Sequence, residues 1–376
     1  MRISIFGDYS PKFGLNDVCR KGDLSIFESI VPFLKGSDLS IVNYESALRS
    51  ANTAPIKKCG PALSTCKESI ALLTSIGFDM VTLANNHTMD YGAEGLQLTI
   101  EELNAKGIDY VGAGKNIEEA EKTYFKTIGG KTLAIINCCE HEFSIASEDR
   151  YGANPLNPVR QFYAIKEARK RADYVVVIVH GGHEFYQLPS VRMQETYRYF
   201  IDCGADAVVN HHQHCFSGWE MHNGKPIVYG LGNFCFDRKE IQEPRSIWNE
   251  GYFVQLSMTK DGVNLTTHPY LQCCGSYKVQ LLEDRTDFDK KISELNSIIA
   301  DKKKLLKAQE EYYSSVEDDV LYFVHPFQSK YYFKAIQGGI IKDRLRGRRL
   351  LELRNLIDCE SHRDKLSFIL NKRING

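Results

Sequence analysis

The chain has 376 residues, a length that accommodates one large domain and a smaller appendage. Lysine and arginine total 47 and aspartate and glutamate 48, so the net charge of -1 gives no general attraction to DNA, RNA or an acidic membrane surface. The first residues lack a signal-peptide pattern, and the longest apolar run, Tyr174–Val179, is much too short to cross a bilayer. The 11 cysteines include no CxxC spacing, which favours free thiols. We therefore expect a cytoplasmic protein without a membrane span.

Short apolar runs alternate with amphipathic stretches of helical length from the first residue to about residue 235. This alternation predicts an α/β fold built around a central sheet. The expected strands are Ile3–Phe6, Leu39–Val42, Met80–Leu83, Thr132–Ile136, Val175–Val179, Ala207–Val209 and Ile227–Tyr229. The expected helices are Glu68–Ile76, Glu94–Lys106, Val159–Arg171 and Val191–Cys203, and several end at a glycine, as helices commonly do.

The sequence changes character towards its C-terminal end. The pairs Asn223-Gly224 and Asp261-Gly262 each lie between two strand-like runs and predict hairpins. After about residue 275 the sequence becomes charged and helical: residues 287–313 predict one long helix, and 323–339 and 343–357 predict further helices. We therefore expect a main domain over 1–275 and a helical C-terminal lobe over 276–376. The cluster Arg344–Arg354 fits either a solvated helix face or an anion-binding or partner surface.

Polar side chains of the metal-ligand type follow five of the expected strands at the point where each strand ends. Open α/β folds place their functional sites at the carboxyl ends of strands. Taken singly, each of these residues has an ordinary explanation as a turn, cap or buried polar residue. Together they indicate a site. They are Asp8, the group Asn43-Tyr44-Glu45, the group Asn85-Asn86-His87, His180, and the group His211-His212-Gln213-His214.

The histidines are concentrated in one part of the sequence, since six of the 11 lie between residues 180 and 222. On an extended segment alternate side chains point to the same side, so His212 and His214 can approach one metal. Carboxylate, amide and imidazole groups together suit Mn, Fe or Zn. Two such ions would share a bridging carboxylate and activate a water, and an uncoordinated histidine could serve as the acid.

The motifs GD, NYES, LANNHTMDYG, HGGHEF, GADAVVNHHQH and YGLGNF, in this order over roughly residues 1–237, resemble the CapA-type family of poly-γ-glutamate and capsule biosynthesis. The resemblance implies a calcineurin-like metallophosphatase sandwich, with mixed β-sheets flanked by helices, followed here by the helical C-terminal extension. It also implies one or two divalent metal ions, with Glu45 as the bridge and His87 as the acid. The implied metal ligands are Asp8, Glu45, Asn86, His180, His212 and His214.

The sequence departs from the metallophosphatase pattern directly after Asp8. The metallophosphatase signature begins with an Asp-x-His pair, but here Tyr9 and Ser10 follow Asp8. One metal position therefore lacks an imidazole.

Asp90 and Glu184 match further pieces of the family strings. We expect them to orient imidazoles or to contact substrate, although Asp90 could equally cap a helix that begins near Gly92. His183 is an additional imidazole that could be a ligand or a substrate contact, and Asn233 could line the same pocket.

Three functions are compatible with these residues. The first is a metal-dependent hydrolase of a phosphoester or a related acidic substrate, either a small molecule or an anionic polymer. The second is a role in building or exporting poly-γ-glutamate or a capsular polysaccharide. The third is a noncatalytic metal-binding scaffold, which the missing imidazole after Asp8 suggests. The sequence encodes neither the substrate nor the oligomeric state.

Overall fold

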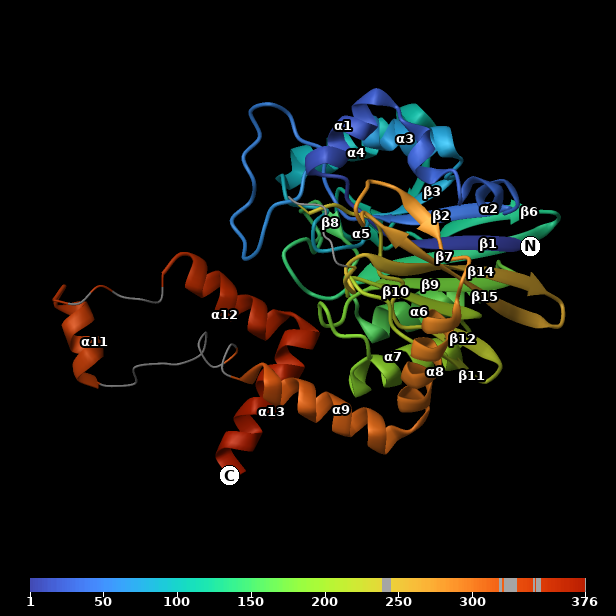
Figure 1. Cartoon of the computed structure of the whole chain (residues 1–376). Coiled ribbons are helices and arrows are strands. Elements are labelled where there is room, and N and C mark those ends of the chain that lie inside the picture. The colour runs from blue at the N-terminus through green and yellow to red at the C-terminus, as the bar shows by residue number, and fades with distance from the viewer. Residues whose placement is uncertain (239–244, 318–319, 321–329, 341, 343–345, 376) are drawn as a thin grey trace.

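Two β-sheets lie face to face, and helices cover their outer surfaces (Figure 1). The computed structural model describes the whole chain except residues 239–244, 318–319, 321–329, 341, 343–345 and 376. This architecture confirms the predicted α/β sandwich of mixed sheets flanked by helices. None of the described helices combines the length and the apolar character needed to cross a membrane.

The first sheet has the strand order β16-β15-β14-β1-β2-β3-β4, and β13 also pairs with β1. Strands β1 to β4 run parallel, whereas β14 is antiparallel to β1 and forms the predicted Asp261-Gly262 hairpin with β15. The strands are β1 (Arg2–Tyr9), β2 (Leu39–Tyr44), β3 (Met80–Thr82), β4 (Asp109–Val111), β13 (Asn233–Cys235), β14 (Glu250–Thr259), β15 (Gly262–Gln272) and β16 (Val279–Leu281). Its outer face packs against α1 (Phe13–Lys21), α3 (Glu68–Ile76) and α4 (Gly92–Lys106).

The second sheet has the order β11-β12-β10-β9-β7-β6. Strands β7, β9, β10 and β12 run parallel, and the predicted Asn223-Gly224 hairpin joins β11 to β12. The strands are β6 (Tyr124–Ile128), β7 (Lys131–Cys139), β9 (Tyr174–His180), β10 (Ala207–His211), β11 (Trp219–His222) and β12 (Lys225–Val228). Its helices are α6 (Pro158–Arg169) and α7 (Val191–Cys203). Shorter elements are η1 (Leu24–Phe27), α2 (Val31–Lys35), β5 (Ala113–Gly114), α5 (Ile117–Ala120) and β8 (Gly152–Ala153).

The main hydrophobic core fills the space between the two sheets. Strand β9, with the sequence YVVVIVH, is buried over all but its first residue, as expected for a strand of a parallel sheet that is covered on both faces. Ile3, Ile5, Ile41 and Val177 from the two sheets belong to the same buried cluster. Complete burial of one such side chain contributes about 1.5–3 kcal/mol, so this core fixes the positions of the strand ends.

The predicted long helix over 287–313 is wrong, because the chain forms two helices that meet at Asp301. These are α8 (Thr286–Ala300) and α9 (Lys302–Ser315). Asp301 has an extended backbone with φ of -108° and ψ of 106°, and its carboxylate accepts hydrogen bonds from the backbone N–H groups of Lys303 and Lys304. An aspartate that caps a new helix in this way ends the preceding one. The break redirects α9 across the loop that follows β9.

The last described helices are α11 (Lys330–Gln337), α12 (Arg348–Asp358) and α13 (Glu360–Asn375). Part of the predicted helix 323–339, and Arg344 of the arginine cluster, lie outside the described residues. Helix α8 contributes Phe288 and Ile292 to the core between the sheets. Helix α13 packs against α9 and α12. The division into a domain over 1–275 and a lobe over 276–376 stays a prediction.

Candidate metal centre

The candidate site lies where the carboxyl ends of parallel strands from both sheets meet. Asp8 lies opposite Asn43 in the register of β1 and β2, and His180 lies opposite His211 in the register of β9 and β10. Because each sheet is parallel at this point, the polar residues that follow its strands gather at one edge. The face-to-face packing then brings the two edges together.

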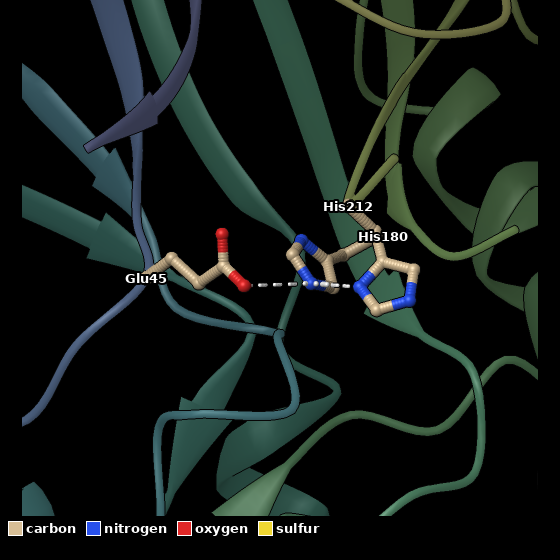
Figure 2. Close-up of side chains that lie close together, drawn as sticks. All are labelled: Glu45, His180 and His212. Carbon is tan, nitrogen blue, oxygen red and sulfur yellow. Dashed lines mark hydrogen bonds and ion pairs between the residues drawn. The ribbon is translucent and has the colours of Figure 1, made fainter. Parts of the chain in front are cut away.

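Glu45 lies at the centre of this arrangement. Its Oε1 is 3.8 Å from Nε2 of His87, 3.7 Å from Nε2 of His180 and 3.8 Å from Nε2 of His214. The side chain is fully buried, and neither oxygen has a hydrogen-bond partner among the residues that the structure describes. Burial, and next the charge of Asp8, raise the pKa of Glu45 well above its usual value. Figure 2 shows its carboxylate facing His180, with His212 beyond.

Two groups of potential ligands share Glu45. In Glu45, His180 and His212 the ligand atoms all lie within 4.8 Å of one another, and the same is true of Asp8, Glu45 and His214. A carboxylate common to two clusters has the position of a bridging ligand. A buried carboxylate without a hydrogen-bond donor, surrounded by imidazoles, fits a divalent cation, since burying it unpaired is unfavourable.

Burial keeps His180 and His214 in the neutral form that binds metals. It lowers the pKa of His180 well below its usual value, with further lowering from His212, and it lowers the pKa of His214 to about 3. Metal ions bind the unprotonated nitrogen of a neutral imidazole, so these histidines are ready to act as ligands without losing a proton.

Asn233 orients His214. It follows Gly232 in the motif YGLGNF. Nδ1 of His214 donates a hydrogen bond of 3.0 Å to Oδ1 of Asn233. This bond leaves Nε2 unprotonated and directed at Glu45, as outer partners of metal-binding histidines commonly ensure. His211 instead has its Nε2 2.9 Å from the backbone oxygen of Phe6, so it belongs to neither cluster around Glu45.

The sequence argument for the His-x-His pair used the wrong backbone conformation. Strand β10 ends at His211, and His212 and His214 have φ values of 96° and 54°. These are left-handed values that non-glycine residues rarely adopt and that are often found at functional sites. Both imidazoles approach Glu45, but they do so from a bend after β10 and not from alternate positions of an extended strand.

Asp90 orients His87 and does not cap a helix. Nδ1 of His87 lies 2.6 Å from Oδ2 of Asp90, and α4 begins after Tyr91 with no side-chain cap. Lys58 forms an ion pair with Asp90, and its Nζ lies 3.0 Å from Nδ1 of His87. Sequence reasoning missed Lys58, which lies in an irregular loop where no periodicity or motif marks it.

The amides of Asn43 and Asn86 link the two sheets at the centre. Nδ2 of Asn43 donates a 2.8 Å hydrogen bond to Asp8 and lies 3.2 Å from Nδ1 of His180. Nε2 of His180 lies 3.0 Å from Oδ1 of Asn86 and 3.0 Å from Nδ1 of His212. Sequence reasoning counted Asn86 as a ligand and placed Asn43 only among the polar residues at the strand ends, although Asn43 opens the NYES motif.

The two polar residues of the HGGHEF motif after His180 lie outside the clusters around Glu45. Nε2 of His183 is 3.1 Å from the hydroxyl of Tyr313 in α9. Glu184 is exposed and forms no hydrogen bond or ion pair within the described part of the chain. The structure therefore gives Glu184 no imidazole to orient, and a contact with substrate stays a prediction.

Aromatic rings and two cations border the side of the centre near His214. The His214 ring lies 5.0 Å from Trp248 and 5.2 Å from Phe236. Nζ of Lys12 lies 4.5 Å from the centre of the Phe236 ring, and the guanidinium of Arg238 lies 4.1 Å from that of Trp248. Lys12 and Arg238 therefore place positive charge against the two rings that contact His214.

The chain is similar to curated capsule proteins over the part that carries this site. It is 34% identical over 222 residues to the PGA biosynthesis protein CapA of Bacillus subtilis strain 168, which covers 58% of each chain. It is 32% identical over 229 residues to the capsule biosynthesis protein CapA of Bacillus anthracis, covering 59% of this chain and 56% of that one. The chain thus spans 56–58% of the length of these relatives.

A solved structure and a family profile are also similar to this chain. A crystal structure of a novel phosphatase from Mycoplasma pneumoniae superposes with a TM-score of 0.43 and 16% identity, over 76% of this chain and 98% of that one. Residues 2–238 match the profile described as bacterial capsule synthesis protein PGA_cap, and they include every residue of the two clusters around Glu45. The chain therefore belongs to the bacterial capsule synthesis protein PGA_cap family.

Proposed function

We propose that this protein is a metal-dependent hydrolase that acts on an acidic substrate of poly-γ-glutamate or capsule synthesis, either a small molecule or a polymer. The observation that supports the proposal most is the environment of Glu45. Its buried carboxylate has three imidazole nitrogens at 3.7–3.8 Å and no hydrogen-bond donor among the described residues. An unpaired buried charge is destabilising, so selection for stability alone does not account for this arrangement.

The donor groups suit one or two ions of the Mn, Fe or Zn class. Bound there, such an ion lowers the pKa of a water molecule and supplies a nucleophile near neutral pH. The residues that would hold the metal are Asp8, Glu45, Asn86, His180, His212 and His214.

His87 is the residue we assign to proton transfer. Asp90 holds its Nδ1, which leaves Nε2 facing the centre at 3.8 Å from Glu45. Burial, and next the charge of Lys58, lower the pKa of His87 and favour its neutral form. As the acid, Nε2 would therefore first take up a proton from water and then pass it to the leaving group.

The charges around the centre support an acidic substrate. Lys12 and Arg238 lie against the rings that border His214, whereas Lys58, beside His87, is already paired with Asp90. A substrate carboxylate or phosphoester placed at the centre would therefore have Lys12 and Arg238 nearby.

Metal analysis of freshly purified full-length protein, combined with an activity screen on phosphoesters and γ-glutamyl amides, tests the proposal. We expect bound Mn, Fe or Zn and hydrolysis of at least one substrate class. The variant His87→Gln should keep its metal and lose about 10²–10⁴-fold in turnover.

The matched control is His222→Gln. His222 lies on β11, and it pairs with Asp202 of α7 and belongs to neither cluster around Glu45. Metal-free purified protein that binds no Mn, Fe or Zn on titration would exclude the proposal. Bound metal without turnover on either class would instead favour the noncatalytic scaffold.

A further inference from the structure

A second group of potential metal ligands lies where the loop after β7 meets the junction of α12 and α13. Glu142 comes from the loop, Cys359 follows α12, and His362 lies in the first turn of α13. One ligand atom from each of the three lies within 4.8 Å of the other two. We propose that Glu142, Cys359 and His362 form a separate metal site of the zinc class that fastens the α12–α13 junction to the main domain.

The three donors form a combination that zinc prefers. Thiolate, imidazole and carboxylate oxygen are its usual protein ligands, and three of them leave a fourth position for water. Cys359 lies directly before α13 with an extended backbone, and His362 lies in the first turn of that helix, so both side chains lie at its start. The two described clusters around Glu45 contain no cysteine, so this site differs from them in chemistry as well as in position.

The surroundings of His362 and Glu142 leave ligand atoms available. The side-chain amide of Asn355 lies 2.9 Å from Nδ1 of His362 and holds the ring, and Oδ1 of the same amide has no other partner among the described residues. With Oδ1 turned towards Nδ1, the amide would accept the ring proton and leave Nε2 for a metal. The carboxylate of Glu142 is half-buried and forms no hydrogen bond or ion pair with any residue for which the structure gives a position. A half-buried carboxylate without a partner beside a thiol and an imidazole is a favourable place for a cation.

Negative charge surrounds Cys359. The side chain is buried, and its Sγ lies 3.7 Å from Oε2 of Glu140. Burial, and next the carboxylates of Glu140 and Glu142, raise the pKa of this thiol well above its usual value. A bound cation reverses this effect and stabilises the thiolate, as metals do for coordinating cysteines.

The position of the site connects it to the metal centre. Glu140 donates its backbone N–H to the backbone oxygen of His180 at 3.0 Å. A metal held by Glu142 two residues further on would therefore stiffen the loop beside a residue of the Glu45 cluster. The proposal does not depend on hydrolysis, since it concerns only how this junction binds a metal.

Cobalt(II) distinguishes the two sites, because only thiolate ligation gives an intense near-ultraviolet charge-transfer band. We expect that chelator-treated full-length protein titrated with Co²⁺ develops this band and that its final intensity corresponds to one thiolate ligand per chain. Zn²⁺ should then remove the band by displacing Co²⁺.

Substitutions assign the band to its ligands. Cys359→Ser should abolish the band while visible absorption from cobalt at the Glu45 centre persists, which also shows that the variant is folded. The matched control Cys203→Ser changes another buried thiol and should keep the band. Glu142→Gln and His362→Gln retain the thiol and should weaken cobalt binding by about 10-fold or more.

The absence of a band in the native sequence at saturating Co²⁺ would overturn the proposal. An undiminished band in Cys359→Ser would do the same. If Cys359→Ser does not fold, wild-type affinity in both Glu142→Gln and His362→Gln would contradict the assignment.

Discussion

Glu45 and Glu140 are both buried glutamates next to His180, yet their surroundings are opposite. Glu140 accepts hydrogen bonds from Arg192 at 2.6 Å, from Ser361 at 2.9 Å and from the backbone of Gly182 at 3.2 Å. Glu45 accepts none from the residues that the structure describes. Burial raises the pKa of both, but the charge of Arg192 and the hydrogen bonds outweigh it at Glu140 and lower that pKa.

This difference indicates that Glu140 is a structural carboxylate and that Glu45 is suited to act as a metal ligand. The bonds of Glu140 join the loop after β7 to α7 and α13, so its charge is compensated by the fold itself. No cation of the described residues lies at hydrogen-bond distance from Glu45, and the carboxylate faces His180, which burial keeps neutral. A strongly perturbed carboxyl group in such a place is a candidate functional residue.

The largest expected effect comes from Glu45→Gln. We expect it to remove most of the bound metal and the hydrolytic activity, because the carboxylate shared by both clusters is lost. The chelator-treated protein should be as stable as the native sequence or more so, because an unpaired buried carboxyl group has been replaced by a neutral amide. Metal analysis and urea unfolding of the metal-free protein measure the two quantities. If Glu45→Gln keeps the wild-type metal content, or if its metal-free form is clearly less stable than the native sequence, the proposed difference between Glu45 and Glu140 is contradicted.

Glu140→Gln should have the reverse effect. Its charged hydrogen bonds with Arg192 are lost, and we expect the free energy of unfolding to fall by about 2–3 kcal/mol. Arg192 retains its ion pair with Asp364 at 2.6 Å, which limits the loss. Urea unfolding of the chelator-treated protein provides the measurement, and Glu118→Gln, at an exposed position of α5, is the control. A stability equal to that of the control would contradict the structural role of Glu140.

The sequence predicts the surroundings of Glu45 better than it predicts the hydrogen-bond network of Glu140. The strands that carry Asp8, Glu45 and His180 follow from apolar runs, because a sheet covered on both faces requires them. The hairpins follow from Asn-Gly and Asp-Gly pairs in the same way. The left-handed turn at His212 and His214 and the pairing of Lys58 with Asp90 do not follow, since tertiary contacts and not local preferences select them. The hydrogen bonds of Glu140 with Cys359 and Ser361 join segments 219 and 221 positions apart in the sequence, and no local pattern predicts them.

His268 provides the smallest expected effect. It lies away from both glutamates, and burial lowers the pKa of its imidazole, so it tests the effect of burial by itself. It lies on β15 against Phe33 and Phe253, and its Nε2 donates a 3.1 Å hydrogen bond to Gln255. Burial, and next the charge of Arg285, lower its pKa from 6.5 to about 4. The unfolded chain therefore binds a proton at this residue more readily than the folded chain does between these two values.

The sign of the pH effect follows from this difference in proton binding. The contribution of a neutral His268 to stability is complete above pH 6.5 and is lost as the pH falls towards 4. We expect the melting temperature of the native sequence to fall more steeply than that of His268→Gln over this interval, and the two curves to run parallel above it. Calorimetry across the pH series measures both slopes. Parallel curves throughout would show that burial alone does not shift an imidazole here, and the shifts at the metal centre would then require the neighbouring charges as well.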